Sequence, residues 1–285
     1  MEKILEVDNL RKTYSDSAFG LKGVNLSIPY GSIVGFIGEN GAGKSTTMSS
    51  ILGLLKKDSG TIKIFEEEMD TDKLHMKEDI GVVFDSIHLP ATLTIKKLEG
   101  VFQHTFDRWN TDTFYSYIDF FALPKSKKIS EFSRGMSMKL SVAVALSHDA
   151  KLLILDEATA GLDAGGRSDM LSVLEEFVRD KRRGVLLSSH ITSDIETIAD
   201  TLVFIKQGEI LWEVSKQDLL NNFAVIQCDV SQYENLKKRD IVAYQKKGNL
   251  LDVLISNQKG LPPFLTAKKF SIDDITLILM RGEIV

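Results

Sequence analysis

One stretch decides the fold of this chain: Gly38-Glu39-Asn40-Gly41-Ala42-Gly43-Lys44-Ser45-Thr46. It follows a short apolar run at residues 33–37 and leads into a segment with helical spacing, which is the setting of a phosphate-binding loop. Glycines let successive backbone N–H groups turn toward one anion, and the positive end of the following helix faces the same point. The stretch predicts a site for a nucleoside triphosphate, with Lys44 reaching the β- and γ-phosphates and Ser45 ligating Mg²⁺.

The composition of the chain limits which classes of protein it can belong to. The 285 residues are 43% hydrophobic and 26% charged, which suits one large domain or one domain plus a small one. The net charge of −5 argues against binding nucleic acid through bulk electrostatics, so we expect no nucleic-acid partner. A single cysteine, Cys228, excludes an intramolecular disulfide framework and favours a reducing cytosol. No apolar run approaches the about 18 residues that span a bilayer, and no signal-peptide layout is present. We expect a cytoplasmic protein, and any membrane role must be peripheral, through a partner.

The order of the patterns predicts an α/β fold. Short strand-like runs at residues 4–7, 24–28, 33–37, 61–65 and 80–84 surround the phosphate loop. A block with helical spacing then occupies about residues 86–150, in which Ile95, Leu98, Val101 and Phe102 are expected to share one apolar face. Alternation of strands and helices resumes from residue 152. We therefore expect a helical subdomain inserted into a sheet-based domain that covers residues 1–221.

The last part of the chain differs in character. Three alternating stretches, around residues 223–230, 240–245 and 249–256, precede the breaker Leu261-Pro262-Pro263 and a helical pattern over residues 272–280. This order predicts a small α+β accessory domain at residues 222–285.

A second chemical element narrows the class of nucleotide site. The continuous apolar run Leu152-Leu153-Ile154-Leu155 reads as a central parallel strand and ends in Asp156-Glu157. Both carboxylates would then lie at the carboxyl edge of the sheet, where nucleotide phosphates bind in such folds. Asp156 would hold Mg²⁺ through water, and Glu157 would polarise an attacking water.

The third element is Ser130-Glu131-Phe132-Ser133-Arg134-Gly135-Met136, which lies between the other two. At this point the chain resembles the ATP-binding subunit of an ATP-binding-cassette (ABC) transporter. Residues 132–136 stand where that family carries its Leu-Ser-Gly-Gly-Gln signature, and they keep the serine and the second glycine. Ser133 also suits a helix N-cap, so that a helix dipole again points at a phosphate. In the family, that phosphate belongs to the ATP held by the opposite subunit.

The resemblance covers roughly residues 1–220 and implies a P-loop NTPase cassette with a mixed sheet core, an antiparallel β subdomain and a helical subdomain. It implies that Tyr14 stacks on adenine, that Asp163 belongs to a loop crossing the dimer interface, and that His190 contacts the γ-phosphate. The implied catalytic residues are Lys44, Glu157 and His190, and the implied Mg²⁺ ligands are Ser45, Asp85 and Asp156. The implied ATP contacts are Tyr14, Gly38, Glu39, Asn40, Gly41, Ala42, Gly43, Lys44, Ser45, Thr46, Ser133, Gly135 and Asp163.

Position 85 departs from the family pattern. The family places a glutamine after the strand at residues 80–84, where it ligates Mg²⁺ and relays nucleotide state to the membrane subunit; this chain has Asp85. Aspartate is a hard oxygen ligand, but it is one methylene shorter and adds negative charge next to Asp156, Glu157 and three phosphates. We expect weaker or more Mg²⁺-dependent ATP binding than glutamine would give.

The partners follow from the same resemblance. Two ATP-binding subunits, identical or paralogous, would close head to tail around two ATP molecules, and hydrolysis would open them. The motion would drive a polytopic membrane subunit, docked at the helical subdomain and around Ile87-His88-Leu89-Pro90. Residues 222–285 are similar in outline to C-terminal extensions of bacterial exporter ATPases that move peptides, antibiotics or lipids, which favours an exporter.

Two alternative functions are compatible with the same ATP-binding cassette fold. A soluble ATP-gated clamp of DNA repair or translation is disfavoured: only about 110 residues without heptads separate the phosphate loop from the acidic pair, and there is one cassette. A regulatory cassette with low turnover is motivated by Asp85, Arg134 and Met136, and the presence of Lys44 and Glu157 argues against it. A phosphate-release assay separates this second alternative from a transporter ATPase.

Overall fold

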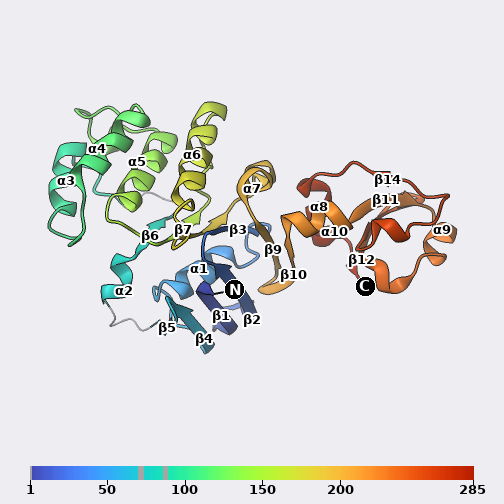
Figure 1. Ribbon diagram of the computed structural model, residues 1–285. Coiled ribbons are helices and arrows are strands. Elements are labelled where there is room, and N and C mark those ends of the chain that lie inside the picture. Colours follow the sequence, from blue (N-terminus) through green and yellow to red (C-terminus); the bar gives the residue numbers. More distant parts are fainter. Residues whose placement is uncertain (1, 70–73, 86–88) are drawn as a thin grey trace.

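Figure 1 shows a computed structural model that describes residues 2–69, 74–85 and 89–285. Within these ranges the strands form three sheets. The largest has the order β10-β9-β3-β8-β7-β6, in which β10 runs antiparallel to β9 and the other neighbours are parallel. Its strands are β3 (Ser32–Ile37), β6 (Ile80–Val83), β7 (Leu152–Asp156), β8 (Gly184–Ser188), β9 (Thr201–Lys206) and β10 (Glu209–Ser215). The expected mixed sheet core is confirmed.

The other two sheets are antiparallel. One has the order β2-β1-β4-β5, built from β1 (Lys3–Tyr14), β2 (Ser17–Pro29), β4 (Ser59–Ile64) and β5 (Glu67–Glu68). The other has the order β14-β11-β13-β12-β15, built from β11 (Ala224–Cys228), β12 (Ile241–Lys247), β13 (Leu250–Ile255), β14 (Ala267–Lys268) and β15 (Glu283–Ile284). β1 and β2 are much longer than the runs that the sequence pattern shows, because they pair with each other along most of their length.

Helices cover the sheets and fill the middle of the chain. They are α1 (Lys44–Ile51), α2 (Leu74–Glu78), α3 (Ile95–Phe102), α4 (Thr111–Phe120), α5 (Arg134–Leu146), α6 (Ala164–Phe177), α7 (Thr192–Ile198), α8 (Lys216–Asn222), α9 (Val230–Glu234) and α10 (Ile272–Arg281). Three short 3₁₀ turns occupy Ile129–Glu131, Lys238–Asp240 and Gln258–Gly260. In the described residues, none of these helices is long and apolar enough to cross a membrane.

The central sheet separates two hydrophobic clusters. Every residue of β3, β7 and β8 is buried, as expected for strands covered on both faces. Along β8, Val185 and Leu187 join the cluster that contains α5 and α6, whereas Leu186 joins the cluster that contains α1 and the antiparallel sheet β2-β1-β4-β5. Alternate side chains of one strand thus hold two layers on opposite faces of the sheet.

The helical region contains α3, α4 and α5 and lies at one end of the central sheet (Figure 1). Ile95, Leu98, Phe114 and Ile118 are fully buried there, as their spacing predicts. The expectation for Val101 is wrong, since this side chain is 46% exposed. At 3.6 residues per turn, it projects about 120° around the helix from Ile95.

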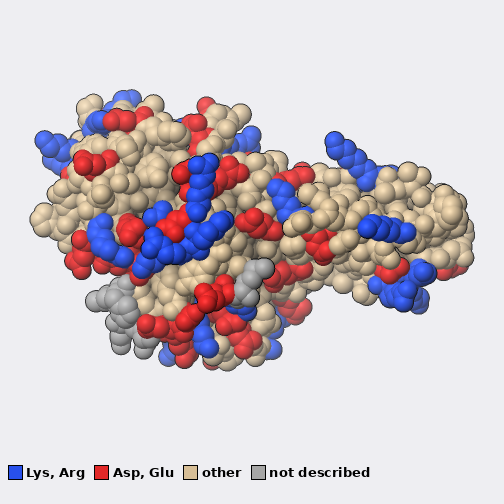
Figure 2. Space-filling model, viewed as in Figure 1, with Lys and Arg blue, Asp and Glu red and all other residues tan. Residues whose placement is uncertain are grey.

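Ion pairs join the helical region to the sheet. Arg108 lies 2.6 Å from Asp79, which precedes β6, and Lys151 lies 3.0 Å from the same carboxylate. Burial opposes ionisation of Asp79, but hydrogen bonds from Arg108 and Lys151 outweigh it and hold the pKa of this carboxyl below its usual value. Figure 2 shows acidic and basic side chains intermixed over this part of the face.

Candidate nucleotide site

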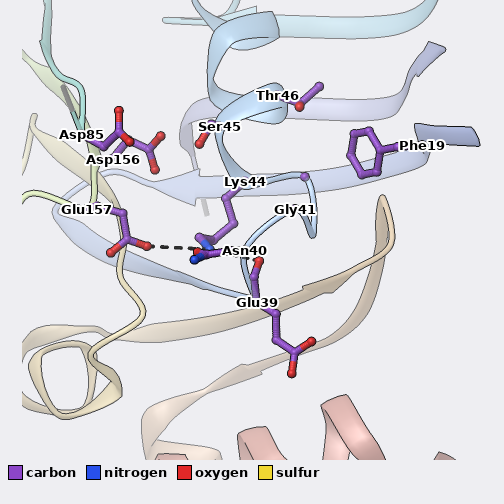
Figure 3. Close-up of a pocket in the computed structure, with 11 residues that line it drawn as sticks. Phe19, Glu39, Asn40, Gly41, Lys44, Ser45, Thr46, Asp85, Asp156 and Glu157 are labelled. Carbon is purple, nitrogen blue, oxygen red and sulfur yellow. Dashed lines mark hydrogen bonds and ion pairs between the residues drawn. The ribbon is translucent and has the colours of Figure 1, made fainter. Parts of the chain in front are cut away.

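A pocket of about 400 Å³ opens at the carboxyl edge of the central sheet (Figure 3). Apart from Phe19, every residue that lines it is one that we assigned from the sequence. The lining residues are Phe19, Glu39, Asn40, Gly41, Gly43, Lys44, Ser45, Thr46, Asp85, Asp156 and Glu157. The pocket therefore brings together the phosphate loop, the acidic pair and position 85, which are far apart in the chain.

The conformation of the loop between β3 and α1 depends on its glycines, as Gly43 and Gly38 show. Gly43 has φ 117°, in the region that L side chains rarely adopt, and it is the N-cap residue of α1. Gly38 has an ordinary φ, but a Cβ there would lie 2.6 Å from the carbonyl oxygen of Ile205. No side chain caps α1, so its first backbone N–H groups are available to an anion in the pocket.

Lys44 is folded back onto this loop. Its side chain is 6% exposed, and its ammonium donates to the carbonyl oxygens of Gly38 at 2.6 Å and Glu39 at 3.4 Å. The same nitrogen lies 3.7 Å from Oε1 of Glu157, the ion pair drawn in Figure 3. A phosphate in the pocket would offer the ammonium a stronger acceptor than two carbonyl groups.

A single hydroxyl, that of Ser188, fixes both members of the acidic pair. It donates to Oδ1 of Asp156 at 2.5 Å and accepts from the backbone N–H of Glu157 at 3.0 Å. Asp156 is 4% exposed, and Glu157 has φ 55°, which is uncommon for a residue other than glycine. This strained turn directs the Glu157 side chain into the pocket, and Ser188 holds it in place.

Glu157 also joins His190 to the pocket. Its Oε2 accepts from the backbone N–H of His190 at 3.2 Å and contacts the ring nitrogen Nδ1 of the same residue. Its Oε1 is buried and, within the described residues, makes no hydrogen bond. The Lys44 ammonium is too far to count as a hydrogen-bond donor, so Oε1 still has capacity to accept a proton or orient a water.

The donor set for a cation is incomplete on the protein alone. Ser45, Asp85 and Asp156 line one pocket and supply a hydroxyl and two carboxylates, which are hard oxygen ligands. The described residues contain no cluster of three or more His, Cys, Asp or Glu side chains suited to a metal. These three residues fit a Mg²⁺ that takes its remaining ligands from phosphate and water, the usual arrangement for this ion.

The aromatic wall of the pocket is Phe19, from β2. Tyr14, which the resemblance favours, is 38% exposed and does not line the pocket. The two rings are neighbours, with centroids 6.3 Å apart and planes at 33°. In Figure 3, Phe19 lies across the pocket from the carboxylates of Asp85, Asp156 and Glu157. A base stacked on Phe19 would leave its phosphates pointing toward the loop.

Besides Tyr14, the predicted residues Gly38, Ala42 and His190 do not line this pocket, and neither do the three that are expected to face the opposite subunit. Ser133 caps α5 by accepting from the N–H of Met136 at 3.2 Å, and both Ser133 and Arg134 are exposed. Gly135 is buried against the loop that contains Gly161, since a Cβ there would lie 3.0 Å from the Gly161 carbonyl oxygen. Asp163 caps α6 by accepting from Gly166 at 2.8 Å. One chain therefore forms a pocket without the segment that resembles the family signature.

Comparison with known proteins identifies the family. The family model described as "ABC transporter" matches residues 21–160. The lantibiotic transport ATP-binding protein SrtF of Streptococcus pyogenes is 34% identical over 217 residues, which are 74% of this chain and 90% of that protein. The chain belongs to the ATP-binding proteins of ABC transporters. It is an ATPase with the P-loop cassette fold that we expected.

Two other relatives and one solved structure extend this result. The linearmycin resistance ATP-binding protein LnrL of Bacillus subtilis is 30% identical over 262 residues, 88% of this ABC protein and 82% of the relative. The bacitracin transport ATP-binding protein BcrA of Bacillus licheniformis is 32% identical over 216 residues, 75% and 70% of the two chains. The structure of cbiO1 from Clostridium perfringens superposes with a TM-score of 0.65 at 26% identity, covering 77% of this chain and 91% of that one.

Sequence reasoning missed two residues of this ABC site. The sequence pattern marks Ser188 only as the end of a strand, but its position at the carboxyl end of β8, opposite Asp156, indicates a place at the site. Phe19 had no such signal, because it precedes the phosphate loop by many residues and reaches the pocket through the pairing of β1 with β2.

We predict that Phe19→Ala weakens ATP binding by roughly 5- to 150-fold, since loss of a base–aromatic stack costs about 1–3 kcal/mol. Binding of inorganic tripolyphosphate, which has no base, should be unchanged. Fluorescence or calorimetric titration of both ligands measures this, with Tyr14→Ala as the matched control. If Tyr14→Ala causes the larger loss for ATP, the base stacks on Tyr14 and the assignment to Phe19 is wrong.

Proposed function

We propose that the chain is the ATP-hydrolysing subunit of an ABC exporter and works as a dimer attached to a polytopic membrane subunit. The observation that carries this is the single pocket in which the phosphate loop meets Asp156 and Glu157, with His190 held by Glu157. The direction of transport is supported by the printed names of relatives, which include bacitracin transport, lantibiotic transport and Nod factor export proteins. Residues 222–285 would be an accessory domain on the cassette of residues 1–221, peripheral at the inner face of the membrane.

The phosphate loop would hold the triphosphate. The N–H groups of residues 40–46 and the start of α1 would bind phosphate oxygens, and Lys44 would leave the carbonyl groups of Gly38 and Glu39 to pair with the β- and γ-phosphates. Ser45, Asp85 and Asp156 would hold Mg²⁺, which supplies positive charge to offset the charge of the phosphates when bound.

Hydrolysis would depend on Glu157 and His190. The unbonded Oε1 of Glu157 is available to accept a proton from water that attacks the γ-phosphate. The backbone N–H and ring of His190 hold Oε2, so the orientation of the carboxylate depends on the position of His190. In turn, we propose that His190 responds to the γ-phosphate, as the family resemblance implies.

The second half of each site would come from another subunit. Ser133 and Arg134 begin α5 on the exposed surface, away from the pocket of their own chain. A helix of 13 residues with a serine cap presents N–H groups to an anion, so it suits a γ-phosphate held by the partner's loop. The methylenes of Arg134 lie over Gly161, about 3.2 Å from where a Cβ would stand, so Arg134 packs on the loop that leads to Asp163.

A groove of about 410 Å³ would receive the membrane subunit. It is lined mainly by apolar side chains of β6, α3 and α5: Lys77, Ile80, Val82, Val83, Phe84, Leu89, Phe102, Phe106, Ser141, Val144, Ala145 and His148. His148 is buried and stacks on Phe106 with ring centroids 4.1 Å apart, and burial lowers the pKa of its imidazole. The groove follows β6 from Ile80 to Phe84, and the next residue, Asp85, lines the nucleotide pocket. We propose that it binds an apolar helix face from a cytoplasmic segment of the membrane subunit.

The docking segment expected from the sequence partly coincides with this groove. Leu89 lines it, whereas Ile87 and His88 lie outside the described residues.

Glu157→Gln tests hydrolysis directly. It should lower phosphate release by at least about 100-fold, because the general base is lost, and it should retain an ATP-bound dimer that is visible by size-exclusion chromatography with MgATP. Glu175→Gln, an exposed change on α6, is the control and should behave as the parent. A Glu157→Gln protein that stays monomeric with ATP or turns over at the parent rate would disprove the role of Glu157. A parent that binds ATP without releasing phosphate would support the low-turnover regulatory alternative.

Asp85→Gln tests the acidic substitution in the cation site. Glutamine still offers an oxygen ligand but does not repel the phosphates, so the variant should bind ATP more tightly and its hydrolysis should depend less on the Mg²⁺ concentration. Asp85→Asn separates charge from length, since it removes the charge and keeps the shorter side chain. Magnesium titrations of phosphate release at constant ATP measure both variants, and unchanged curves would show that Asp85 does not act on the cation.

Leu89→Asp tests the docking groove. A charge on its rim should abolish co-purification with a co-expressed polytopic membrane subunit, while hydrolysis by the isolated ATP-binding subunit stays within about twofold of the parent. The matched control is Phe120→Asp, which places a charge on an exposed apolar residue of α4 outside the groove. Equal binding of both variants to the membrane protein would place the docking site elsewhere.

A further inference from the structure

The C-terminal segment, defined here as residues 222–285, shares a hydrophobic core with the cassette. Ile272, Ile275, Ile278 and Leu279 of α10 are at most 3% exposed and belong to the same buried cluster as Ile195 and Ile198 of α7. Figure 1 shows α7 on the side of the central sheet that faces this segment. Burial on this scale makes the segment a fixed part of the cassette rather than a tethered appendage.

Two polar contacts join the start of α10 to α7. The hydroxyl of Thr192 donates to Oδ1 of Asp273, and the backbone N–H of Ile272 donates to Oε2 of Glu196 at 3.4 Å. Thr192 and Glu196 are four residues apart and therefore lie on one face of α7. Thr192 is 6% exposed, so its hydroxyl is largely screened from water. These contacts fix the rotation of α7 relative to α10 as well as its distance.

The restrained helix begins two residues after His190. Its N-cap, Ile191, has no side chain able to cap, and the N–H of Ile191 donates instead to the Ser189 hydroxyl at 2.9 Å. His190 is thus held on one side by Glu157 and on the other by a helix whose first residue is bonded to Asp273. Two residues of chain span about 7 Å at most, so a rotation of α7 displaces His190 directly.

We propose that the C-terminal segment positions His190 for hydrolysis through the bond between Thr192 and Asp273. Thr192 and Asp273 are positioning residues, because neither lines the nucleotide pocket. The inference rests on the proposed function, namely that His190 and Glu157 act together on ATP. It assigns to residues 222–285 a role in the rate of hydrolysis rather than in nucleotide binding.

Thr192→Val is the first variant, because valine keeps the shape of threonine and removes the donor. It should lower kcat for ATP hydrolysis by about 3- to 10-fold and leave KM for ATP within about twofold, since the pocket residues are unchanged. Thr192→Ser, which keeps the hydroxyl, should restore kcat. Asp273→Ala should match Thr192→Val, and the double variant should be no slower than either single one, because both remove the same bond.

Asp274→Ala is the matched control on the same turn of α10. Asp274 accepts from Ser271 in the capping box, and the bonds recorded for it among the described residues involve Ser271 and not α7, so its loss weakens α10 without cutting the bond to Thr192. The proposal expects kcat near the parent value for this control. It is overturned if Asp274→Ala slows hydrolysis as much as Asp273→Ala does, if Thr192→Ser fails to rescue, or if Thr192→Val keeps the parent kcat.

His190→Ala separates this inference from the proposed function. If His190→Ala hydrolyses ATP at the parent rate, the proposed role of His190 fails, and the positioning role fails with it. If His190→Ala is inactive while Thr192→Val and Asp273→Ala both keep the parent kcat, the proposed function stands and the positioning role alone is wrong.

Discussion

The nucleotide site depends on the parallel alignment of β3, β7 and β8. β8 lies between the other two, and its last residue, Ser188, pairs with Phe36 near the end of β3 and with Asp156 at the end of β7. Because parallel strands present their carboxyl ends at one edge, the phosphate loop, the acidic pair and the His190 turn must emerge together. The register of these parallel strands thus determines which side chains lie close enough to contact one another.

The Ser188 hydroxyl fixes the side chains that this strand register brings together. By donating to Asp156 and accepting from the Glu157 backbone, it holds a buried carboxylate and a strained turn in one arrangement. Each of these features would be unfavourable alone. A buried carboxylate needs a hydrogen-bond donor, and the left-handed backbone conformation of Glu157 needs hydrogen bonds that stabilise it. In the mechanism proposed above, Asp156 would then face the cation and Glu157 would accept a proton from water.

Much of the site could be predicted because its signals are local. The phosphate loop is contiguous, and Asp156 and Glu157 follow an apolar run whose burial on both faces is implied by its composition. The position of Phe19 in the pocket could not be predicted from the sequence, because it depends on the pairing of two long antiparallel strands whose register shifts several times. The prediction for Val101 is wrong for a simpler reason. Val101 is three residues from Leu98, but it is six residues from Ile95 and therefore does not share one helix face with both. The packing of α10 on α7 could not be predicted either, since the apolar residues of a helix do not specify which other helix they pack against.

The shared core of α7 and α10 has a consequence for how nucleotide state can spread through the subunit. Packed interiors move between discrete arrangements rather than deforming smoothly, so a displacement of His190 large enough to move α7 must be accompanied by α10 or strain the contacts between them. Reciprocal coupling holds for binding free energies and not for kcat, so the C-terminal segment can alter the rate of hydrolysis while the affinity for ATP stays the same. A segment joined only by a flexible linker would have no such effect. In the proposed coupling, the buried isoleucines of α10 therefore matter to the nucleotide site as much as the bond between Thr192 and Asp273 does.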